Sequence, residues 1–114
     1  MSMKLTTREV SGVTIVDLSG KITLGEGGVT LREEVRSLVA MGSKKIVLNL
    51  AEVSYIDSSG LGELVSAYTA VKNAGGELKL LNLTSKVRDL LVITKLVTVF
   101  DVKDDEASAV SSFA

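Results

Sequence analysis

KIVLNLAEVSYIDSSGL, residues 45–61, passes from a strand pattern into the start of a helix. Residues 45–50 are aliphatic on both sides, which is typical of a strand covered on both faces of its sheet. Asp and Ser at positions 57–59 are preferred N-cap residues, and Asn-Ala-Gly-Gly at 73–76 is a helix end signal. Between them lies an apolar stripe at helical spacing: Leu61, Leu64, Val65, Tyr68 and Val71. The stretch therefore predicts a buried strand that runs through a short polar turn into an amphipathic helix.

Further strands are expected before and after this unit. The runs 13–18 (VTIVDL), 77–83 (ELKLLNL) and 97–101 (VTVFD) are short and rich in aliphatic or β-branched residues. No strand is predicted before residue 13. Because the strands alternate with helical patterns, the sequence predicts one α/β domain, residues 1–114, with a largely parallel sheet.

Three more helices are expected around these strands. In the first, Thr30 and Glu33 have the spacing of a capping box, and in the second Thr84 or Ser85 can cap the helix. The third begins with three acidic residues at 104–106, which the helix macrodipole favours. The inward-facing residues expected for the three helices are, in order, Leu31, Val35 and Leu38; Val87, Leu90, Leu91 and Thr94; and Ala107, Val110 and Phe113.

The composition excludes several classes of protein. The 114 residues contain no His and no Cys, which removes the usual metal ligands, the usual base at neutral pH and the thiol nucleophile. We therefore expect no enzyme activity, no metal and no cofactor. The 13 Lys and Arg against 14 Asp and Glu give a net charge of −1, so direct nucleic-acid binding is not expected. The longest strictly apolar runs have four residues, which predicts a cytoplasmic protein without a membrane segment.

The turn at residues 57–62, DSSGLG, is the most unusual local sequence. A plain helix cap accounts for one Asp or Ser, but two hydroxyls and two glycines exceed what one cap needs. A serine hydrolase is not supported, because no histidine is present and the segment is not G-x-S-x-G. Nucleotide binding is not supported either, since the glycines at 25–28 match no phosphate-binding motif and are typical of a surface loop.

Phosphorylation of a serine in this turn is the remaining chemical option. A phosphoserine carries about −1.5 to −2 charge, and a helix N-terminus favours negative charge. The modification should therefore leave the helix intact and act on a partner. Glycines beside the serines would remove side chains that keep another protein away from the seryl oxygens.

Three segments together resemble a known family. They are V-L-N-L-x-x-V-S-Y-I-D-S-S-G-L-G-x-L from residue 47, A-G-G-E-L-K-L-L-N-L from residue 74, and V-x-x-L-L-x-I-T-K-L from residue 87. The sequence is similar to the anti-sigma factor antagonists of the STAS-domain family. This resemblance implies a mixed sheet with helices mainly on one face. It also implies binding to an anti-sigma factor that is a serine/threonine kinase, release of a sigma factor, loss of binding on phosphorylation, and recovery through a metal-dependent serine phosphatase.

The resemblance also implies roles for single residues. Ser58 is the expected phosphoacceptor, with Ser59 as the alternative. Many members have an acidic residue where this chain has Thr23, which follows Gly20-Lys21-Ile22. Because STAS modules also occur as scaffolds, an interaction module without a phosphorylation switch is the alternative function. The expected partner-binding residues are Asp57, Ser58, Ser59, Gly60, Leu61, Gly62 and Thr23.

Overall fold

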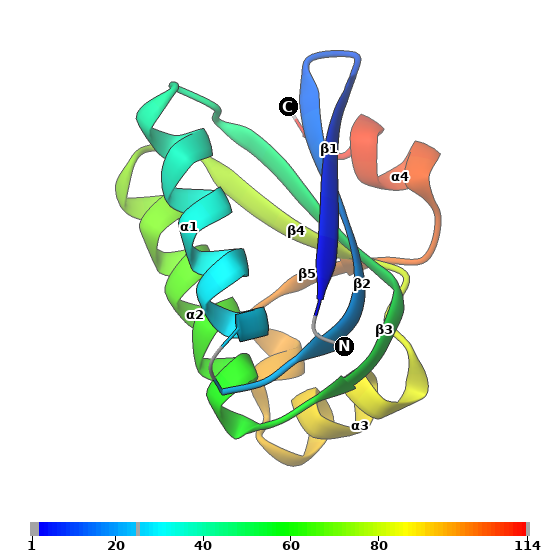
Figure 1. The fold of residues 1–114 in the computed structure, drawn as a ribbon. Helices are drawn as coiled ribbons and strands as arrows, with labels where there is room; N and C mark the ends of the chain where they lie inside the picture. Colours follow the sequence, from blue (N-terminus) through cyan, green and yellow to red (C-terminus); the bar gives the residue numbers. More distant parts are fainter. Residues whose placement is uncertain (1–2, 25, 114) are drawn as a thin grey trace.

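The computed structural model describes residues 3–24 and 26–113. These residues form a five-stranded sheet with helices on both faces (Figure 1). Along the chain the elements are β1 (Lys4–Val10), β2 (Val13–Ile22), α1 (Glu26–Ala40), β3 (Lys45–Ile56), α2 (Ser58–Asn73), β4 (Glu77–Leu81), α3 (Ser85–Ile93), the 3-10 turn η1 (Leu96–Thr98), β5 (Asp101–Lys103) and α4 (Glu106–Ser111). None of the helices in the described ranges is long and apolar enough to cross a membrane.

The strands lie in the order β1-β2-β3-β4-β5. β1 pairs antiparallel with β2, and the other three pairs are parallel. The two strands of every parallel pair are joined by a connection that contains a helix, as is usual for parallel strands. The prediction of a mixed, largely parallel sheet in an α/β domain is confirmed.

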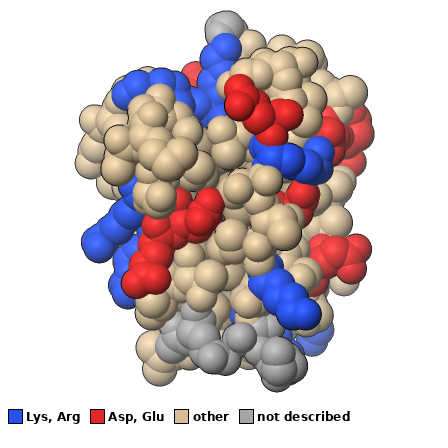
Figure 2. Space-filling view, turned by 45° about the horizontal axis from the view of Figure 1, so that its top comes forward, with Lys and Arg blue, Asp and Glu red and all other residues tan. Residues whose placement is uncertain are grey.

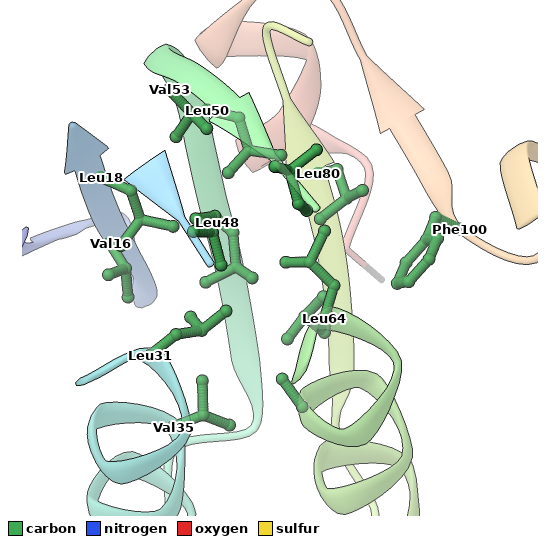
Figure 3. Packing of buried hydrophobic residues seen from close by; sticks show 14 of the residues in the cluster. Val16, Leu18, Leu31, Val35, Leu48, Leu50, Val53, Leu64, Leu80 and Phe100 are labelled. Atoms are coloured by element: carbon green, nitrogen blue, oxygen red, sulfur yellow. The ribbon is translucent and has the colours of Figure 1, made fainter. Parts of the chain in front are cut away.

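The larger hydrophobic core lies between the sheet and helices α1, α2 and α3. Figure 3 shows Leu31 and Val35 of α1 and Leu64 of α2 directed toward the sheet, where Leu48 of β3 and Leu80 of β4 meet them. These five side chains are at most 1% exposed. The close packing of aliphatic side chains fixes the height of both helices above the sheet.

Helix α4 covers the opposite face of the sheet (Figure 1). Its Ala109 packs in a smaller buried cluster that is made of Val13, Ile15, Val47 and Leu81. β3 is therefore buried on both faces, as the double-sided apolar pattern of residues 45–50 predicts. With three helices on one face and one on the other, the expectation of helices mainly on one face is also confirmed.

Two strand predictions are wrong. The residue pattern misses β1 because most of its side chains are exposed, and the strand is held by its backbone ladder to β2. The last strand, expected at 97–101, is shifted: residues 97–100 are not part of a strand, and β5 begins at Asp101. Leu96–Thr98 is a 3-10 turn whose apolar side chains pack on the larger core, and pairing with β4 begins only at Asp101.

The start of α1 also differs from prediction. The helix begins at Glu26, so Thr30 lies inside it and the Thr30–Glu33 capping box is wrong. The surface loop expected at 25–28 is wrong for Gly27 and Gly28, which lie buried in the first turn of the helix, while residue 25 falls outside the described residues. A Cβ on Gly27 would lie 2.3 Å from the carbonyl oxygen of Lys21, so the glycine allows α1 to start close against β2.

Two details of the later helices differ as well. Thr84 is the N-cap of α3, but its hydroxyl donates to the carbonyl of Val53 at 3.0 Å instead of capping the helix. In α4, Ala107 is expected to face inward but is exposed, and Ala109 is the fully buried residue of this helix.

Candidate functional site

The candidate site lies where β2 and β3 end side by side. Both strands continue beyond the predicted ranges, and they pair with each other as far as Ile22 and Ile56. Thr23 and Leu24 follow β2, while Asp57 and helix α2 follow β3. The carboxyl ends of parallel strands thus bring these two connections together, at the edge where open α/β sheets commonly carry their sites.

Asp57 joins the two connections through hydrogen bonds. Its Oδ1 accepts from the N–H of Gly60 at 2.7 Å and caps α2, as the sequence predicts. Its Oδ2 accepts from the N–H of Leu24 at 3.2 Å, and its own N–H donates to the carbonyl of Ile22 at 3.3 Å. Because both carboxylate oxygens accept hydrogen bonds from backbone N–H groups, Asp57 ties the end of β2 to the start of α2.

The two glycines of the turn have different roles. Gly60 is buried, and a Cβ on it would lie 1.9 Å from the carbonyl oxygen of Ile22. A Cβ on Gly62 would meet nothing within 4 Å, and this residue is exposed. The expectation that glycines keep side chains away from a partner therefore fits Gly62, whereas Gly60 lets the helix start press against β2.

Ser58 and Ser59 are both exposed. Within the described ranges, neither hydroxyl makes a hydrogen bond. Leu24 is 80% exposed beside them, and Tyr55 is 43% exposed just before the turn. Leu61, by contrast, is only 6% exposed and points into the larger core. The surface that a partner could touch here therefore consists of two free hydroxyls next to apolar side chains.

A hollow of about 280 Å³ opens between the β2–α1 connection and the start of α2. Its lining includes Thr23, Ser59, Arg32 and Glu63, so Thr23 and the second serine border the same hollow. Arg32 Nη1 lies 3.1 Å from Glu63 Oε2, which links α1 to α2. The other carboxylate oxygen, Oε1, is buried without a hydrogen-bond partner among the described residues.

The charged residues that line the hollow are of opposite sign, Arg32 and Glu63. Figure 2 shows positive and negative side chains scattered over the face that it presents, with no large patch of one sign. In the part of the chain that the structure describes, no three His, Cys, Asp or Glu side chains are grouped to hold a metal ion. The groups that the site offers to a partner include the two exposed serine hydroxyls.

Sequence reasoning missed Leu24, Arg32 and Glu63. Leu24 follows β2 and is tethered to Asp57, which lies 33 residues later in the chain. Arg32 and Glu63 come from different helices and are 31 residues apart. No local motif marks any of these residues, and only the meeting of the two crossover connections brings them to the serines.

Comparison with known proteins agrees with this fold. The family model described as the STAS domain matches residues 4–109. The anti-sigma-B factor antagonist of Bacillus subtilis is 38% identical over 87 residues, which cover 76% of this chain and 78% of the relative.

Two solved structures share the fold. The anti-sigma factor antagonist of Mycobacterium paratuberculosis superposes with a TM-score of 0.85 at 21% identity, covering 96% of this chain and 92% of that one. The Bacillus cell fate determinant SpoIIAA in its phosphorylated form gives a TM-score of 0.74 at 18% identity, covering 97% of this chain and 100% of that one. With the family model matched from β1 into α4, this chain belongs to the STAS domain family.

Proposed function

We propose that this chain is an anti-sigma factor antagonist that is switched by phosphorylation of Ser58. Unmodified, it binds an anti-sigma factor that is also a serine/threonine kinase, and the sigma factor is released in the cytoplasm. One observation carries the proposal: Ser58 presents an exposed hydroxyl, free of hydrogen bonds among the described residues, at the first position of a firmly capped helix. The relatives that are named anti-sigma factor antagonists support the same function.

In the phosphoryl transfer, this chain contributes the nucleophile and the kinase contributes ATP and the catalytic groups. The Ser58 Oγ forms a bond to the γ-phosphorus of ATP, the bond from that phosphorus to the bridging oxygen breaks, and ADP leaves. The hydroxyl proton goes to a base of the kinase, since protein kinases carry a catalytic carboxylate that accepts it. This chain supplies a rigidly held nucleophile, and the kinase supplies the catalytic groups.

Phosphorylation would change the surface and leave the fold intact. The free N–H groups and the macrodipole at the start of α2 favour a negative group there. SpoIIAA, which shares this fold, has been solved in a phosphorylated form. The phosphate adds about −1.5 to −2 charge directly after Asp57, which is hydrogen-bonded to the exposed Leu24, so a partner that packs on this surface would have to bury a charge.

Removal of the phosphate would restore the binding surface. In the proposed cycle a metal-dependent serine phosphatase directs a water molecule onto the phosphorus. Inorganic phosphate leaves, and the Ser58 oxygen recovers a proton. The exposure of Ser58 makes the phosphate accessible to a second enzyme without any movement of α2.

A second candidate function is a STAS interaction module that uses no phosphorylation switch. The Asp57 cap favours it, since capping alone explains an Asp at this position. The two functions differ in their response to modification. A plain module keeps its partner affinity when Ser58 carries a phosphate, whereas the switch loses it.

Phosphosite mapping tests the proposal. The purified chain is incubated with ATP and a serine kinase encoded beside its gene, and phosphopeptides are mapped by mass spectrometry. Ser58→Ala and Ser59→Ala are compared with Ser66→Ala, an exposed serine two turns further along the same helix. We expect one phosphate on the wild type, Ser59→Ala and Ser66→Ala, and none on Ser58→Ala. Absence of phosphate from the wild type, or full labelling of Ser58→Ala, would overturn the switch.

A further inference from the structure

The two serines of the turn face different surroundings along helix α2. Residues four apart on a helix are neighbours on the same face. The residue four positions after Ser58 is Gly62, around which a Cβ would meet nothing within 4 Å. The residue four positions after Ser59 is Glu63, which is ion-paired with Arg32 of α1. Ser58 therefore faces open solvent, whereas Ser59 faces a charged pair.

The hollow beside Ser59 brings these groups together. Ser59, Arg32 and Glu63 line the same cavity, and Arg32 and Glu63 are its two charged lining residues. Arg32 uses Nη1 for Glu63, and its side chain as a whole is 40% exposed, so other N–H groups of the guanidinium can still bind an anion. An arginine elsewhere in this chain already serves two anions, since Arg8 donates to both Asp17 and Glu106.

We infer that Arg32 is an internal phosphate ligand that makes the two serines non-equivalent: a phosphoryl group on Ser59 pairs with Arg32 of the same chain, whereas one on Ser58 faces outward. The pairing does not require that the kinase itself modifies Ser59. A phosphate that Arg32 partly neutralises presents less charge to a partner. This inference rests on the proposed function only for that last consequence, and it explains why Ser58 is the position that acts outward.

Phosphorus-31 NMR on site-specifically phosphorylated protein tests the inference without any partner. Phosphoserine is installed at position 58 or 59 of the full chain by genetic encoding, and the second pKa of each phosphate is measured by titration. We expect Arg32→Gln to raise the pKa of phospho-Ser59 by about half a unit or more, because an opposite charge is lost. The same substitution should leave phospho-Ser58 unchanged, which makes phospho-Ser58 the matched control.

A second variant covers the case in which Arg32→Gln disturbs the contact between α1 and α2. Glu63→Gln leaves Arg32 free for the phosphate and removes a competing carboxylate, so it should lower the pKa of phospho-Ser59. An unchanged titration of phospho-Ser59 in both variants, or equal shifts at the two serines, would overturn the inference. A kinase that leaves Ser58 unmodified would instead overturn the proposed function, and the NMR result would stand separately.

Discussion

Substitution of Gly60 by Ala tests how the serine-bearing turn is held against the sheet. A methyl group at this position would lie 1.9 Å from the carbonyl oxygen and 2.7 Å from the carbonyl carbon of Ile22. Both atoms belong to the backbone at the end of β2, so no side-chain rotation can relieve the clash. The start of α2 must move away from β2, and the hydrogen bond from the Asp57 N–H to Ile22 must weaken.

Two opposing effects determine how much Gly60→Ala changes the free energy of unfolding. Replacing Gly by Ala in a helix stabilises it by about 0.5 to 1 kcal/mol, because the unfolded chain loses conformational freedom. Overpacking a close contact typically costs about 1 to 3 kcal/mol, and occasionally more when backbone must shift. We expect the clash to dominate, so that Gly60→Ala is destabilised by about 1 to 2 kcal/mol.

Gly62→Ala is the matched control in the same helix. A Cβ at Gly62 meets nothing within 4 Å, so this variant should be more stable than the wild type by about 0.5 to 1 kcal/mol. Urea unfolding followed by circular dichroism gives both free energies from one protocol. If Gly60→Ala were as stable as Gly62→Ala, the close contact with Ile22 would not position the turn, and the reasoning would be refuted.

Three further predictions concern stability. Asp57→Ala removes the cap of α2 and should lower the free energy of unfolding by about 1 to 2 kcal/mol in urea titrations, and an unchanged midpoint would contradict the capping role. Arg8 lowers the pKa of Asp17 and Glu106 through hydrogen bonds, so their stabilisation is present above the ordinary values of 3.8 and 4.5 and is lost as pH falls below them. Arg8→Met should flatten this acid dependence in urea midpoints measured between about pH 6 and 3, and an unaltered slope would count against the pairing. Leu64→Ala empties a fully buried position and should cost about 2 to 5 kcal/mol, whereas a loss below about 1 kcal/mol would mean that it does not face the core.

The sequence predicts the fold well where burial imposes a period on the residues. β3 is covered on both faces and α2 on one, so their apolar patterns and the turn between them can be recognised from residue spacing alone. β1 shows no such pattern because most of its side chains face solvent, and its place depends on the backbone ladder with β2. The apolar residues near Val97 mislead for the opposite reason. They are partly buried by packing against the core, without forming a strand.

Some features of the candidate site follow from neighbouring residues in the sequence, and others depend on contacts between distant segments. The cap by Asp57 and the exposure of the serines follow from local helix chemistry, and the structure agrees with both. The burial of Gly60 depends on how closely β2 approaches, which no spacing in the sequence encodes. The pair of Arg32 and Glu63 depends on the contact between two helices. The contact between α1 and α2 thus gives the two adjacent serines different surroundings.

Affinity for the anti-sigma kinase, measured with and without phosphate on Ser58, tests the central claim most directly. Isothermal titration calorimetry can compare the unmodified chain with protein that carries genetically encoded phosphoserine at this position. Circular dichroism of both forms verifies that the fold is unchanged. We predict tight binding of the unmodified chain and at least a tenfold weaker complex of the phosphorylated one, a difference of about 1.4 kcal/mol or more. Equal affinity of two equally folded forms would contradict the phosphorylation switch.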